Sequence, residues 1–139
     1  MEEFPPSPNA AAPSSCRRGA AGGDAAIVDG AELMERLGDR GLFEDVIAIF
    51  LDDCPRRLAV LETAVERSDA VLIEETAHIL KGAAGNLSAT RLFEAAQTLE
   101  RIGANGELGA AEAAWRQLAI EAARVISRLR RFAREGVGG

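Results

Sequence analysis

Residues 70–87 read AVLIEETAHILKGAAGNL, and this stretch contains the only histidine of the 139-residue chain. Its apolar residues recur at spacings of three and four, which is typical of an amphipathic helix. At about 100° per residue, the apolar stripe lies on the side of the helix opposite His78. The stripe consists of Leu72, Ile73, Ile79, Leu80, Ala83, Ala84 and Leu87. The sequence therefore predicts a helix that is capped by Ser68 or Asp69, ends near Gly85 or Asn86, and exposes His78 to solvent.

Four further helical segments flank this stretch. A short one at residues 30–37 has Asp29 as its N-cap and Gly38 as its stop signal. The next runs to about residue 67 and contains Pro55, which predicts a kink. Ser88 or Ala89 opens another, and the glycines of residues 103–106 end it. The last carries an apolar stripe over residues 111–132.

The apolar stripes of these segments define the expected core. The expected inward residues are Phe43, Val46, Ile47, Phe50, Cys54, Leu58, Leu61 and Val65; Leu92, Ala95, Ala96, Leu99 and Ile102; and Ala111, Trp115, Leu118, Ala122, Val125, Leu129 and Phe132. The breaks between the long segments are short, which favours antiparallel neighbours. We predict an all-α fold, an up-down antiparallel four-helix bundle with a short additional N-terminal helix.

The first 26 residues differ in composition from the remainder. They contain four of the five prolines, several glycines and no apolar periodicity. Such a segment buries too little apolar surface to offset the entropy of ordering it. We predict a disordered tail at residues 1–26 and one bundle domain at residues 27–135.

Charge and hydropathy exclude several classes of partner. The net charge of −6 and the pI of about 4.9 disfavour binding to a nucleic-acid backbone. The longest apolar run, residues 46–51, is far shorter than the ~18 residues that span a bilayer. The acidic, proline-rich start lacks the features of a signal peptide. We expect a cytoplasmic protein without nucleic-acid or membrane partners, in which Cys54 is a buried apolar residue and forms no disulfide with Cys16.

The neighbours of His78 on its helix face indicate chemistry. Lys81, one turn away, is the only lysine in the chain. Gly82 and Gly85 lie on the same face, and each glycine inside a helix costs about 1 kcal/mol relative to alanine. We interpret them as leaving the imidazole sterically open. Glu74 and Glu75 are close enough to orient the ring, although solvated charges would look the same.

Several functions of a histidine do not fit this pattern. A single histidine without a thiolate cluster offers too few ligands for a metal site. No serine or cysteine lies three or four residues from His78, so acyl transfer is disfavoured. An exposed imidazole is, however, a good nucleophile toward a phosphoryl group, and a nearby lysine can neutralise phosphoryl oxygens.

The stretch from Ala77 to Ala89, followed by Leu92 and by Leu99 and Glu100, resembles the signature of histidine-containing phosphotransfer (HPt) domains of multistep two-component phosphorelays. The resemblance implies that His78 is phosphorylated, Lys81 stabilises the phosphoryl group and Gly82 admits the partner's active site. Glu100 would fill a position near the histidine where the family often has Gln or Glu. Ser88 departs from the pattern, because members commonly carry Gly there. A serine can cap the next helix, so we expect the departure to alter a turn and leave the chemistry intact.

The resemblance implies a phosphorelay intermediate that accepts a phosphoryl group from a receiver-domain aspartyl phosphate and transfers it to another response regulator. Its partners would be receiver domains or a hybrid histidine kinase. The chain would need no cofactor of its own, since Mg²⁺ would belong to the receiver. The sequence contains no glycine-rich nucleotide-binding loop. We therefore expect a phosphotransfer intermediate without autokinase activity, which is not an enzyme. We expect a monomer.

Two alternatives stay open at this point. The dimerisation and phosphotransfer helices of a histidine kinase also expose a helical histidine, and a non-catalytic adaptor bundle would bind a kinase or receiver without carrying phosphate.

A further feature is the basic end of the last helix, with Arg124, Arg128, Arg130, Arg131 and Arg134. We interpret these arginines as complementing the helix dipole.

Overall fold

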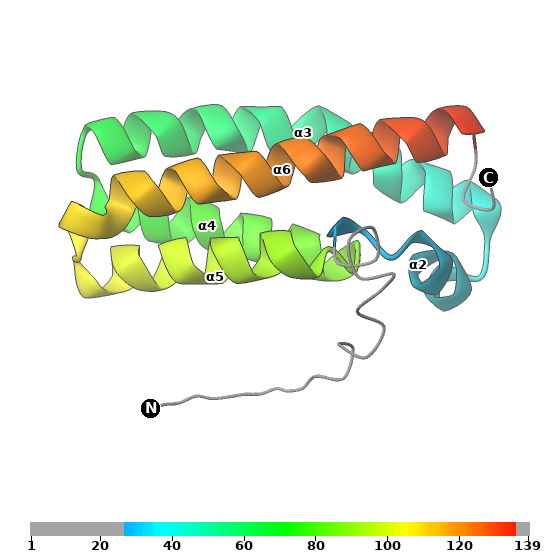
Figure 1. Ribbon diagram of the computed structural model, residues 1–139, viewed down its shortest axis with the longest axis horizontal. Helices are drawn as coiled ribbons and strands as arrows, with labels where there is room; N and C mark the ends of the chain where they lie inside the picture. The colour runs from blue at the N-terminus through cyan, green and yellow to red at the C-terminus, as the bar shows by residue number, and fades with distance from the viewer. Residues whose placement is uncertain (1–26, 136–139) are drawn as a thin grey trace.

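The computed structural model describes residues 27–135, and every element within this range is a helix (Figure 1). The elements are α2 (Gly30–Leu37), α3 (Arg40–Glu66), α4 (Ala70–Asn86), α5 (Thr90–Asn105), the 3₁₀ turn η2 (Leu108–Ala110) and α6 (Ala111–Glu135). Each long helix packs against its neighbours in the chain, and α6 closes the ring against α3. The predicted bundle with a short N-terminal helix is confirmed, whereas the predicted tail at residues 1–26 lies outside the described residues.

Helix α2 lies at one end of the bundle, beside the start of α3 (Figure 1). Its predicted cap is present, because the Asp29 carboxylate accepts a hydrogen bond of 3.0 Å from the backbone N–H of Glu32. Gly38 follows the helix at a φ of +70°, a conformation that glycine adopts without steric penalty.

No helix in the described part of the chain is both long enough and apolar enough to span a membrane.

The core is formed by the apolar stripes that the periodicity predicts, except that α4 is rotated about its axis relative to the prediction. In α4 the buried face includes Ala77, which the predicted stripe omits, and Ile79 is 41% exposed although it was expected inward. Packing against α5 turns α4 toward Ala77, and Ile79 therefore lies on the outer surface near His78.

Cys54 is buried as expected, and burial raises the pKa of its thiol to about 12. Helix α3 continues through Pro55, and in Figure 1 its cyan beginning turns away from the line of its green remainder.

Helices α4 and α5 approach closely because α5 contains a glycine at their contact. A β-carbon on Gly103 would lie 2.7 Å from the backbone nitrogen of Glu74 and 2.9 Å from the carbonyl oxygen of Ala70. The predicted end of α5 within residues 103–106 is confirmed, although Gly103 itself is still helical. The helix continues to Asn105, and Gly106, at a φ of +70°, follows it. Gly103 instead sets the distance between the two helices that carry the candidate site.

Gly103→Ala is expected to lower the free energy of unfolding by about 1–3 kcal/mol, because the new methyl group meets rigid backbone atoms. Gly82→Ala is a matched control on α4, since a β-carbon there meets nothing within 4 Å. Its expected effect is a stabilisation of up to ~1 kcal/mol. Urea unfolding of both variants checks the contrast. Equal free energies of unfolding for the two would contradict the close approach at Gly103.

Ser88 has a different role from the one predicted. It does not cap α5, whose N-cap residue is Ala89 without a side-chain cap hydrogen bond. Ser88 has a φ of +57°, in the left-handed region that favours glycine. Its hydroxyl donates a hydrogen bond to Glu32 and accepts one of 3.1 Å from Arg36, which also donates to the carbonyl oxygen of Asn86. Ser88 therefore ties α2 to the turn between α4 and α5.

A buried carboxylate connects α5 to α6. The side chain of Glu121 is 4% exposed, and one of its oxygens accepts hydrogen bonds from Arg91 at 3.1 Å, Gln117 at 3.0 Å and Arg124 at 3.2 Å. These donors satisfy a charge that would be costly to bury alone. Arg91 comes from α5 and the other two donors from α6, so the network fixes how these helices are paired.

Candidate functional site

His78 lies in the middle of α4, on the face directed away from the core. Its side chain is 65% exposed. Ala77, which directly precedes His78, and Leu80, two positions after it, are almost completely buried. The helix is therefore anchored on one side of the histidine while the ring itself is accessible. This confirms the predicted exposure of His78.

Glu100 of α5 joins the histidine to the lysine. Its Oε2 atom lies 2.8 Å from Nδ1 of His78, and its Oε1 atom lies 2.7 Å from Nζ of Lys81. A carboxylate only accepts hydrogen bonds when ionised, so Nδ1 must carry the proton in this contact. When the ring is neutral, the other ring nitrogen, Nε2, holds the lone pair and is the atom that could act as a nucleophile.

The ionised form of Glu100 is favoured by its two partners. The largest cause is the hydrogen bond from Lys81, and the hydrogen bond from His78 acts in the same direction. Partial burial opposes them, yet the pKa of Glu100 is lowered from its ordinary value of 4.5. The carboxylate is thus charged at neutral pH. Glu74 and Glu75, the other candidates for orienting the ring, lie on α4 itself, and the contact to Nδ1 comes from Glu100.

The two glycines of this face differ in their surroundings. A β-carbon on Gly82, one turn beyond His78, meets no atom within 4 Å, which fits the predicted steric opening. A β-carbon on Gly85 would lie 3.6 Å from the ring of Phe93 on α5. Gly85 is exposed, and a β-carbon there would make only an ordinary contact with Phe93, so its interpretation as a clearance for the imidazole stays a prediction. The open surface beside His78 is at Gly82.

Removal of the Glu100 carboxylate is expected to change the tautomer of His78. In Glu100→Ala the Nδ1 proton loses its acceptor, whereas in Glu100→Gln the amide oxygen can still accept it. Imidazole ¹⁵N shifts should report the Nδ1-protonated tautomer in the wild type and in Glu100→Gln, and a mixture in Glu100→Ala. An unchanged spectrum for Glu100→Ala would contradict the contact.

The lowered pKa of Glu100 also predicts how stability depends on pH. The folded state keeps this carboxylate ionised to lower pH than the unfolded chain does, so its contribution to stability is complete above about pH 4.5. That contribution is lost as pH falls through the lowered pKa. The difference in free energy of unfolding between the wild type and Glu100→Ala should therefore shrink from pH 7 to pH 3. A difference that grows on acidification would contradict the assignment.

Comparisons with known proteins agree with this geometry. The Hpt domain family model matches residues 45–131. Among solved structures, the fold is similar to that of histidine-containing phosphotransfer protein B (HptB) from Pseudomonas aeruginosa PAO1, with a TM-score of 0.67 and 30% sequence identity. The match covers 78% of this chain and 90% of that protein. A search of curated proteins finds no match. The family match spans more than half of the chain, and the chain therefore belongs to the Hpt domain family, whose members perform histidine phosphotransfer in phosphorelay signalling.

Proposed function

We propose that His78 is the phosphoryl-accepting residue of this Hpt domain. The observation that carries the proposal is the contact between Nδ1 of His78 and Glu100, at 2.8 Å, which in the neutral ring leaves the lone pair on Nε2. The ring is exposed, its orientation is fixed, and the surface beside it at Gly82 is open. These are the requirements for a nucleophile that must meet a reacting group held by another protein.

The proposed donor is the aspartyl phosphate of a response-regulator receiver domain. The Nε2 lone pair forms a bond to phosphorus while the bond between phosphorus and the aspartyl oxygen breaks, and the carboxylate leaves with the electron pair. The ring keeps its Nδ1 proton and becomes positively charged. Glu100 stabilises this charge through the hydrogen bond it already makes. Attack by an aspartate of a second receiver reverses these steps and regenerates neutral His78.

Lys81 supplies the positive charge nearest to the transferred group. Its ammonium binds Glu100 at 2.7 Å and is 23% exposed, so it is held one turn from His78 rather than extended into solvent. In the phosphorylated state its remaining N–H groups would donate to phosphoryl oxygens. Mg²⁺, which transfer from a receiver requires in this proposal, would be bound by the receiver.

Incubation with receiver domains that have been phosphorylated beforehand tests the proposal. The expected product is a phosphoryl group on this protein that is labile in acid and stable in base, as expected for a phosphohistidine. Incubation with ATP alone should give no label, because the chain is proposed to be an intermediate without autokinase activity. A base-labile phosphoryl group, or labelling by ATP alone, would contradict the proposal.

Lys81→Ala is expected to slow phosphoryl transfer by about 100- to 1,000-fold, as loss of one donor to a transition state does. The fold and the His78 tautomer should be unchanged, because Glu100 still accepts the Nδ1 proton. Lys81→Arg should restore activity in part. The arginine carries the same charge, but its wider and longer head fits the site less well. Transfer at the wild-type rate by Lys81→Ala would remove the electrostatic role of this lysine.

The alternatives give different results in the same assays. A histidine-kinase dimerisation module would elute as an obligate dimer, whereas four long helices in one chain are expected to close a bundle as a monomer. A non-catalytic adaptor would bind a receiver or kinase without acquiring a phosphoryl group. Size-exclusion chromatography and the labelling experiment therefore separate the three proposals.

A further inference from the structure

The second half of α6 carries a positive charge that the phosphotransfer site does not use. Residues 122–135 contain five arginines and one glutamate, a net charge of +4 in a chain whose net charge is −6. The helix dipole acts within the last turn, and the basic residue in that turn is Arg134. Arg124 and Arg128 lie well before this turn, so the helix dipole does not explain their presence.

Three of these arginines line one groove with a volume of about 320 Å³. We call this the arginine groove; its walls are Ile27, Ala123, Arg124, Ser127, Arg128 and Arg131. The spacing of four and three residues places the arginines on one side of α6. Ile27 and Ala123 add apolar surface, and Ser127 adds a hydroxyl. The groove therefore presents several cationic donors over a small apolar floor.

Two of the three arginines in the groove bind carboxylates of α6, which hold their side chains in place. Arg124 donates to the buried carboxylate of Glu121, which Arg91 and Gln117 also neutralise. Arg131 lies 3.4 Å from Glu135, and both side chains are more than half exposed. An exposed pair at this spacing contributes little, so an incoming carboxylate can replace Glu135.

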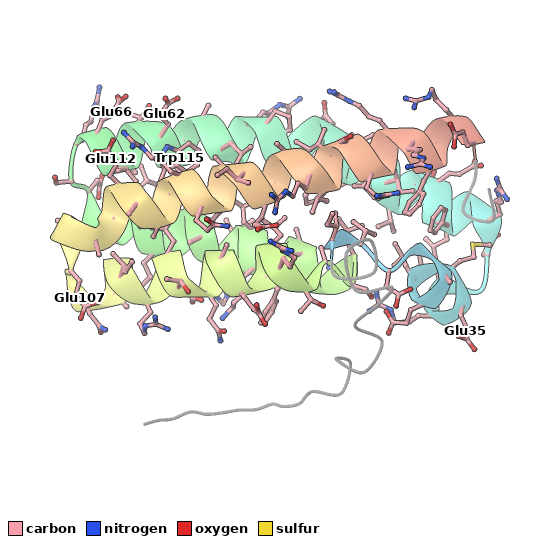
Figure 2. The ribbon with its side chains drawn as sticks, viewed as in Figure 1. Glu35, Glu62, Glu66, Glu107, Glu112 and Trp115 are labelled. Carbon is pink, nitrogen blue, oxygen red and sulfur yellow. The ribbon has the colours of Figure 1, made fainter. Side chains whose placement is uncertain are left out.

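We propose that the arginine groove is a docking site for a short acidic segment of a partner protein. Guanidinium groups form paired hydrogen bonds with carboxylates, and the groove gathers three arginines in a chain whose net charge is −6. Many exposed carboxylates lie elsewhere; Figure 2 shows Glu62, Glu66 and Glu112 at the end of the bundle where α3 ends and α6 begins. A long polyanion reaching beyond the groove would meet this negative charge, whereas a short segment would not.

This site is separate from His78. The groove lies on α6, which packs against α3 and α5, whereas His78 lies on α4 and is bonded to α5. A partner bound at the groove would leave the imidazole accessible. The groove can therefore tether a partner without blocking phosphoryl transfer.

The test measures fluorescence anisotropy of a labelled, glutamate-rich decapeptide titrated with the full chain. The variant is Arg128→Gln with Arg131→Gln, and the matched control is Arg130→Gln with Arg134→Gln, which removes the same charge from the same helix outside the groove. The groove variant is expected to bind about tenfold more weakly, equivalent to ~1.4 kcal/mol, and the control to change less than about twofold. Labelling of His78 by phosphoramidate should be unchanged in both, and circular dichroism should show both folded.

Three results would overturn the proposal. Equal weakening in both double variants would show that the peptide responds to net charge alone. Binding of anionic lipid vesicles or of single-stranded DNA, with the peptide unbound, would show a different class of ligand. Asp24 is three residues before Ile27, and a chain of three residues reaches about 10 Å. A several-fold gain in peptide affinity for Asp24→Asn would show that the chain's own carboxylate is the occupant.

Discussion

His78→Gln is expected to abolish phosphoryl transfer completely while leaving the fold intact. The loss is total because the chain contains no second histidine. The stability is retained because the side chain is 65% exposed and contacts Glu100 at the surface. Substitutions at such sites usually change the free energy of unfolding by less than about 0.5 kcal/mol. The measurement is transfer from a phosphorylated receiver, together with thermal unfolding of the same sample.

Two outcomes would contradict this prediction. Residual labelling of His78→Gln would place the acceptor on another residue. Unfolding of the variant would mean that His78 has a packing role, against its observed exposure. Glu100→Gln serves as the control, because it removes a charge beside the ring and keeps both the histidine and an acceptor for Nδ1.

Gly82→Gln is expected to fold normally and to receive phosphoryl groups from receivers far more slowly than the wild type. The position is open, so a side chain fits without displacing any atom of this protein. A glutamine there would nevertheless obstruct the approach of a receiver, since the reacting atoms must come within ~3–3.5 Å. Gly82→Ala should be at least as stable as the wild type, with modestly reduced transfer.

A small phosphodonor separates obstruction of docking from damage to the nucleophile. Phosphoramidate is small enough to reach His78 past a glutamine side chain, so it should label Gly82→Gln at nearly the wild-type rate. Equal loss with phosphoramidate and with a receiver would show that the substitution impairs His78 itself. The proposed role of Gly82 as a clearance for the partner would then be wrong.

Local signals predicted much of the fold correctly. The caps of α2 and α4 and the stop at Gly38 depend on residues within one helical turn, and all three are confirmed. The exposure of His78 follows from apolar periodicity alone. The burial of Ala77 and the exposure of Ile79 do not, because they depend on how the neighbouring helices pack against α4, which periodicity cannot reveal.

Contacts between distant residues were not predictable in this way. Ser88 pairs with Glu32 and Arg36, more than 50 residues earlier, and a serine beside a helix start looks like a cap until these partners are known. Arg91 and Glu121 are 30 residues apart, and each reads as a surface charge in the sequence. Glu100 was singled out by resemblance only. Its role as a bridge between His78 and Lys81 required the packing of α5 on α4.

The most direct test of the central claim is an NMR measurement on the phosphorylated protein with ¹⁵N-labelled histidine. Because the chain has a single histidine, any one-bond coupling between ¹⁵N and ³¹P belongs to His78. We expect this coupling at Nε2, with Nδ1 still protonated and hydrogen-bonded to Glu100. Coupling at Nδ1, or a phosphorylated protein without any such coupling, would contradict it.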